Sequence, residues 1–238
     1  MKQYENHIIL SLVLVAIIAL YGFADHRHES QKVEDVTVSF TDYKEPLISQ
    51  ENVNKLLIQS EDTLQNLTVE KLDLNRSELS LENNAMIRAA QVSVDLKGRM
   101  HVIVEQRVPV ARIIADSSFY LDKENKIMPL SQEYAARVPL VMGYHSSDQD
   151  EVYELISFLR NDEYMESMVT QIDMSNSENV ICSLRALDFD IALGNVEDLQ
   201  TKFYNFKAMM AQLEKNEAMD EVKRLDLRFD NQVVVIKK

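Results

Sequence analysis

Apolar and polar residues alternate along three short stretches in the first half of the chain, with the period of a half-buried β-strand. The alternating apolar positions are Val36, Val38 and Phe40, then Val92, Val94 and Leu96, then Met100, Val102 and Val104. Two segments with helical spacing lie between the first two strands, one after Ser49, a suitable N-cap, and a weaker one after Asn75. Lys97-Gly98 is a turn signal that predicts a hairpin between the second and third strands. The order strand, helix, helix, strand, strand predicts a small α+β unit with two helices on one face of a three-stranded sheet.

The alternation stops after Val104, in the stretch Gln106-Arg107-Val108-Pro109. Pro109 has no backbone N–H to give to a β-ladder, so it marks a strand end, a sheet edge or a hinge. The chain has 238 residues, which is long enough for two modest cores. We therefore expect one α+β unit over residues 33–112 and a second unit with a different plan over residues 113–238.

The second unit combines several short strands with two helices. Ser118 to Pro129 predicts a strand, a polar turn and a second strand, Val138 to Gly143 is an apolar segment ended by glycine, and residues 168–174, 180–184 and 189–193 predict three more strands. Helical spacing appears at Val152, Leu155, Ile156 and Leu159, and again from Val196 to Leu213 with Asn195 as the expected N-cap. The aromatic and methionine stripe of the longer helix is typical of a core, and fewer than three heptads are present for a coiled coil. The pattern predicts a mostly antiparallel β domain.

The end of the chain predicts a strand at the edge of a sheet. Leu225, Leu227 and Phe229 alternate with polar residues, Asp230-Asn231 predicts a turn, and the chain finishes with a β-branched run before Lys237-Lys238. An edge strand leaves N–H and C=O groups open to another chain, and strand addition is a known binding mode. The two lysines could guard this edge or simply solvate the terminus.

An uncharged apolar run extends from Ile8 to Ala24. Its 17 residues are at the short end of the roughly 17–25 that span a bilayer as a helix, and exceed the usual core of a signal peptide. We expect a transmembrane helix over residues 8–24, with a cytoplasmic tail over 1–7 and a juxtamembrane linker over 25–32. Gly22-Phe23-Ala24 resembles a cleavage site, so secretion with removal of the run is the alternative.

Composition and charge exclude several functions. The formal net charge of −14 argues against a nucleic-acid partner, because a basic footprint for phosphates is lacking. The single cysteine, Cys182, rules out an internal disulfide and the usual cysteine zinc frameworks. No Ser-His-Asp, Cys-His or metal-ligand spacing appears, and Asp188 and Asp190 alternate with apolar residues as a solvated face does. We expect no enzymatic activity, cofactor or metal.

Local motifs occur in a fixed order along the chain: Met86-Ile87-Arg88-Ala89-Ala90-Gln91-Val92, Val104-Glu105-Gln106-Arg107-Val108-Pro109-Val110-Ala111-Arg112, Phe119-Tyr120-Leu121-Asp122, Val138-Pro139-Leu140-Val141-Met142-Gly143 and Leu225-Asp226-Leu227-Arg228-Phe229. Taken in this order, they resemble the FtsQ/DivIB family of bacterial cell-division membrane proteins over nearly the whole chain. Each is weak alone, but their order and spacing are specific. Two turns depart from the family pattern: Asn83-Asn84-Ala85 lacks a proline, and Asn125 stands where glycine is common.

The resemblance implies a single-span inner-membrane protein with its N-terminus in the cytoplasm and its other domains in the periplasm. Residues 33–112 would form a POTRA-like domain, and residues 113–238 an FtsQ-type β domain. The family recruits the FtsB/FtsL coiled-coil pair to the division septum and helps to control the septal peptidoglycan synthase, a non-catalytic role. The partner FtsB adds a strand along the last edge of the β domain. The matching positions here are Arg228, Phe229, Asn231, Gln232, Val233, Val234 and Val235. The backbone of residues 231–235 would supply the ladder, Phe229 an apolar anchor, and Arg228 a partner for an acidic side chain.

Two other functions remain as alternatives. One is a membrane-tethered envelope enzyme that acts on the cell wall. The other is a POTRA module in the transport of polypeptides across the envelope, although neither repeated POTRA copies nor a barrel is present.

Overall fold

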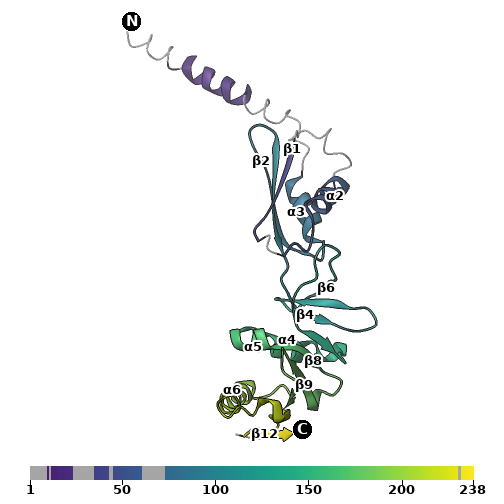
Figure 1. Cartoon of the computed structure of the whole chain (residues 1–238). Coiled ribbons are helices and arrows are strands. Elements are labelled where there is room, and N and C mark those ends of the chain that lie inside the picture. Colours follow the sequence, from purple (N-terminus) through teal and green to yellow (C-terminus); the bar gives the residue numbers. More distant parts are fainter. Residues whose placement is uncertain (1–9, 11, 24–34, 43–44, 61–72, 230–231) are drawn as a thin grey trace. The chain divides into compact units, whose positions relative to one another are not determined.

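The computed structural model describes residues 10, 12–23, 35–42, 45–60, 73–229 and 232–238. The chain divides into two compact units, Met1–Gln106 and Arg107–Lys238 (Figure 1). We describe each unit by itself.

The first unit has the predicted order of elements. It contains β1 (Asp35–Phe40), α2 (Gln50–Ser60), α3 (Leu74–Glu82), β2 (Ile87–Val94) and β3 (Arg99–Gln106). The strands form one sheet in the order β1-β3-β2, in which β3 pairs in parallel with β1 and antiparallel with β2. Met100, Val102 and Val104 of the central strand are completely buried, as the alternating pattern predicted.

Local signals define the helices of this unit. The Ser49 hydroxyl accepts the Asn52 N–H at 3.3 Å, so Ser49 caps α2 as predicted. The second helix begins with Asp73 as its N-cap, whose carboxylate accepts the Arg76 N–H at 3.0 Å. The hairpin between β2 and β3 turns at Gly98, which has a φ of 78°. Leu96 lies in this turn and is 83% exposed, so it does not continue the strand as we expected.

The boundary between the units lies earlier than the predicted division after residue 112. Residues 109–112 belong to β4 (Pro109–Ile113), which pairs with strands of the second unit on both sides. Arg107 is held there as well, because its guanidinium donates to the Asp122 carboxylate at 2.8 Å. Pro109 marks the first residue of a strand, a position where its missing N–H is tolerated.

The second unit contains a nine-stranded sheet. Its remaining elements are β5 (Phe119–Asp122), β6 (Ile127–Pro129), β7 (Leu140–Met142), α4 (Gln149–Arg160), α5 (Glu163–Met168), β8 (Val169–Asp173), β9 (Val180–Leu184), β10 (Asp190–Gly194), α6 (Leu199–Lys215), β11 (Val222–Asp226) and β12 (Val234–Lys237). The strand order is β12-β11-β10-β9-β8-β7-β4-β5-β6. Most neighbours are antiparallel, but β10–β11, β4–β7 and β7–β8 are parallel.

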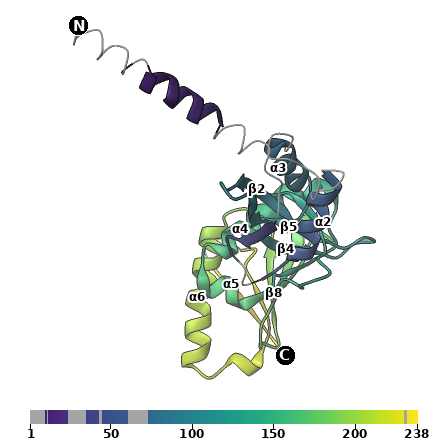
Figure 2. The same ribbon diagram turned by 90° about the horizontal axis from the view of Figure 1, so that it is seen from above.

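One face of this sheet forms the core with the three helices, which lie along one side of the strands (Figure 2). A row of paired residues crosses the sheet on this face: Ile113, Val141, Ile172, Cys182, Ile191, Leu225 and Val235. The stripes of α4 and α6 pack into the same cluster, and Phe158 stacks on Phe203 with ring centroids 5.4 Å apart. The aromatic stripe is therefore core, as predicted.

Two predictions about the helices of this unit need correction. The prediction of two helices missed α5, a short helix whose N-cap Asp162 accepts the Met165 N–H at 3.2 Å. The expected N-cap Asn195 does not cap α6, because Asp198 occupies that position with a left-handed φ of 51°. Asn195 instead accepts hydrogen bonds from Lys202 Nζ through its carbonyl and its side-chain oxygen.

The predicted transmembrane run lies partly outside the described residues. Residues 12–23 are helical and exposed. Within the described part of the chain, no helix has both the length and the apolar content that a membrane span requires.

Candidate partner-binding edge

The last strand of the chain lies at the edge of the nine-stranded sheet, as the sequence predicted. β12 pairs antiparallel with β11, so that Val235 lies opposite Leu225 and Val234 opposite Asp226. It follows β11 after a short loop, of which residues 230–231 lie outside the described residues.

The backbone of β12 alternates in direction. Lys238 donates its N–H to the Glu221 carbonyl at 2.9 Å, so the backbone of Lys238 faces β11. Because successive strand residues direct their backbone groups to opposite sides, those of Val235 and Lys237 point away from β11. The outer side of β12 therefore offers two sets of N–H and C=O groups in the spacing that an added strand requires.

The side chains of β12 also divide between two faces. Val233 and Val235 are partly buried and pack against the helix-covered core. Val234 and Ile236 point to the opposite face and are 37% and 39% exposed. A neighbouring strand would cover apolar surface on both faces, which is favourable because apolar area leaves water.

Arg228 is bound within the chain by the nearby Asp226. Its guanidinium donates to both carboxylate oxygens of Asp226, with the shortest contact from Nη2 at 2.6 Å. Nη1 also donates to the Asn179 side chain at 3.3 Å. These hydrogen bonds from Arg228 hold the pKa of Asp226 below its ordinary value, so both groups remain charged near neutral pH.

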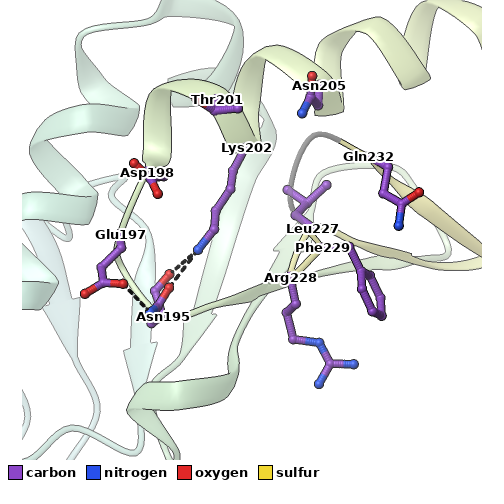
Figure 3. Close-up of a pocket in the computed structure, with 10 residues that line it drawn as sticks. All are labelled: Asn195, Glu197, Asp198, Thr201, Lys202, Asn205, Leu227, Arg228, Phe229 and Gln232. Atoms are coloured by element: carbon purple, nitrogen blue, oxygen red, sulfur yellow. Dashed lines mark hydrogen bonds between the residues drawn. The ribbon is translucent and has the colours of Figure 1, made fainter.

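A pocket of about 430 Å³ lies beside the start of β12. Its walls come from the loop before α6, the first turns of α6 and the residues on either side of the β11–β12 turn (Figure 3). The lining residues are Asn195, Glu197, Asp198, Thr201, Lys202, Asn205, Leu227, Arg228, Phe229 and Gln232. Phe229 stands at its rim and is 47% exposed. The pocket is mostly polar, and Lys202 is directed toward Asn195 within it.

The structure brings most of the predicted binding residues to one place. Arg228, Phe229 and Gln232 line the pocket, while Val234 and Val235 lie in the edge strand and Val233 directly precedes it. Asn231 lies outside the described residues. Sequence reasoning missed Asp226 and Lys202. In the sequence Asp226 is only a polar position that alternates with Leu225 and Leu227, whereas in the structure its side chain is buried, with 3% of the residue exposed.

Among the described residues, no cluster of three or more His, Cys, Asp or Glu side chains could hold a metal ion. Cys182 is completely buried, and this burial raises the pKa of its thiol to about 12. It is therefore a core residue rather than a reactive thiol.

Comparisons with known proteins agree with the resemblance noted in the sequence. The cell division protein FtsQ of Salinibacter ruber is 26% identical over 157 residues, which are 58% of this chain and 60% of that protein. This chain thus spans about 60% of the length of that curated relative. Among solved structures, the major extracytoplasmic domain of the cell division protein DivIB from Geobacillus stearothermophilus is 15% identical. The match covers 46% of this chain and 96% of that domain, with a TM-score of 0.33.

Residues 108–235 match the family described as FtsQ/DivIB, C-terminal related. The match begins one residue before β4 and ends within β12, so it spans the nine-stranded sheet and more than half of the chain. The chain belongs to the FtsQ/DivIB family of cell-division proteins.

Proposed function

We propose that this protein is a non-catalytic scaffold of the division machinery that binds its partner by adding a strand to β12. The partner would be a coiled-coil protein of the FtsB/FtsL type, and the assembly would help to control septal peptidoglycan synthesis. In this proposal residues 8–24 anchor the chain in the inner membrane with the N-terminus in the cytoplasm. The α+β part of the first unit, from β1 to β3, serves as a POTRA-like periplasmic module.

The observation that carries the proposal is the difference between β12 and the other sheet edges. At the far end of the same sheet, β6 is only three residues long and ends in Pro129, two features that discourage pairing. In unit 1, the Val38 carbonyl of β1 accepts the Gln50 side-chain amide at 3.1 Å. Within the described residues, no side chain is hydrogen-bonded to the backbone of β12, and its Lys237 reaches back to Glu221 instead.

The added strand would engage Val235 and Lys237 through their backbone groups. Val234 and Ile236 would gain an apolar neighbour on the open face, while Phe229 would contact the partner near the pocket. Arg228 is already paired with Asp226, so an acidic partner residue would share its guanidinium.

Proline at position 235 tests this mechanism. Because the Val235 N–H points away from β11, Val235→Pro removes an outward donor and leaves the β11–β12 hydrogen bonds in place. Val235→Ala loses comparable packing but keeps the N–H, so it is the matched control. We expect Val235→Pro to bind the coiled-coil partners at least tenfold more weakly than Val235→Ala, measured by titration of the full chains in detergent micelles. Equal affinity of the two variants would exclude strand addition at β12.

Localisation in dividing cells tests the wider role. A fluorescent fusion of the protein should gather at the septum, and its depletion should give filaments. Incubation of the purified full chain with peptidoglycan addresses the rival enzymatic function, and release of soluble fragments would favour that rival.

A further inference from the structure

The first unit has its own edge strand, β2, and two of its outward amides, those of Ala90 and Val92, are already occupied. The Val92 N–H donates to Glu78 Oε1 at 2.7 Å, and the Ala90 N–H donates to Glu82 Oε1 at 3.2 Å. Both glutamates belong to α3, the helix packed beside this strand. Two side chains therefore take the place that a neighbouring strand would fill.

The match between helix and strand has a simple geometric cause. Glu78 and Glu82 are four residues apart on α3, so they share one face about 6 Å apart along the helix. Ala90 and Val92 are two residues apart on β2, and their N–H groups point to the same side with a spacing of about 6.7 Å. Because the pairs run in opposite order along the chain, each carboxylate meets one amide.

We propose that Glu78 and Glu82 close β2 against strand addition, and that without them β2 pairs with the β2 of a second copy of this chain. The strand Ile87–Val94 has one charged residue, Arg88, whose charge is paired with Glu105 at 2.7 Å. Such a strand is prone to edge-to-edge pairing unless it is protected.

The inference goes beyond the proposed function because it concerns the edge that does not take a partner. It explains how one chain with several sheet edges directs strand addition to β12. Its test involves no division partner, so it can fail or succeed independently of the β12 mechanism.

The direct test is the oligomeric state of Glu78→Ala/Glu82→Ala in the full chain, measured by sedimentation velocity in detergent micelles. We expect the dimer to form at a concentration at least tenfold lower than for the unaltered chain. Glu151→Ala/Glu154→Ala removes two exposed glutamates from α4 and is the matched control for charge. Glu78→Gln/Glu82→Gln keeps an acceptor oxygen at each position and should behave like the unaltered chain. An unchanged alanine variant, or a glutamine variant that also dimerises, would overturn the hydrogen-bonded closure.

A cysteine at position 91 locates the contact. Gln91 is exposed, and an antiparallel pair that sets Ala90 opposite Val92 of the second copy sets position 91 opposite itself. The native Cys182 is completely buried, so an introduced thiol is the accessible one. Gln91→Cys should give a disulfide-linked dimer in the alanine background and not in the unaltered background, and addition of Val92→Pro should abolish it. A dimer that fails to cross-link, or that persists with Val92→Pro, places the association elsewhere and refutes the β2 edge.

Hydrogen exchange in the unaltered chain covers the case in which the alanine variant fails to fold. The amides of Ala90 and Val92 should be protected although they lie at a sheet edge, because each donates to a carboxylate. Exchange of both at the rate of an unstructured peptide would contradict the proposal.

Discussion

Individual residues near strand ends take their roles from their backbone conformation or from one close neighbour. Gly143 has a φ of 68°, and a Cβ there would overlap the backbone of Ser175. The glycine that ends the predicted apolar segment is thus required by both conformation and space. Asn125 adopts a φ of 59° at the turn where the family often has glycine, a conformation that asparagine tolerates. Asp226 fixes the position of Arg228 in a similar way, because its buried carboxylate accepts hydrogen bonds from the guanidinium beside the pocket.

The pairing of Asp226 with Arg228 predicts a specific loss of stability in acid. Arg228 lowers the pKa of Asp226 in the folded chain, whereas the unfolded value is about 3.9. The stabilisation is therefore fully present above that value and is lost as the pH falls through the folded pKa. We expect Asp226→Asn to lower the free energy of unfolding by about 2 kcal/mol at pH 7. In urea unfolding at several pH values, this difference should shrink below about pH 4, and a constant difference would contradict the assignment.

At the scale of the elements, helix α6 supports the sheet next to the candidate edge. Phe203, Phe206 and Met210 face the core, and Val235 of the edge strand packs against the same cluster. The helix and the edge strand therefore share one hydrophobic core. The start of α6 is less regular than its sequence suggested, because Asp198 enters the left-handed region to begin the helix.

Truncation of a side chain to alanine should destabilise the protein on the buried face of α6 but not on its exposed face. Phe206 is completely buried, so Phe206→Ala should lower the free energy of unfolding by about 3–5 kcal/mol. Tyr204 on the same helix is 71% exposed, and Tyr204→Ala should change it by less than about 0.5 kcal/mol. Thermal and urea unfolding of the two variants would measure the contrast, and a large loss from Tyr204→Ala would contradict the exposed position of this side chain.

At the scale of the whole molecule, the chain consists of two units that each have their own sheet and core. The predicted boundary after residue 112 would divide β4 from the sheet that it completes. The boundary found at Gln106–Arg107 leaves β4, and the ion pair of Arg107 with Asp122, within the second unit.

Fragments that begin at these two boundaries should differ in whether they unfold cooperatively. A fragment of residues 107–238 should unfold cooperatively, since it contains every strand of the nine-stranded sheet. A fragment of residues 113–238 lacks most of β4, which lies between β7 and β5, and should show no cooperative transition by circular dichroism. Cooperative unfolding of the shorter fragment would instead support the predicted boundary after residue 112.

Periodicity alone determined the number and order of the elements in the first unit, most strands of the second, the burial of the long helix stripe and an edge strand at the end of the chain. These features depend on neighbours in sequence, because apolar spacing decides which side of a helix or strand is buried. The tertiary structure alone decided the boundary, the parallel pairings, the burial of Asp226 and the occupation of the β2 amides by Glu78 and Glu82. Each of these depends on which distant residues meet, since a strand or a carboxylate takes its partner from the packing of whole elements and not from its own sequence.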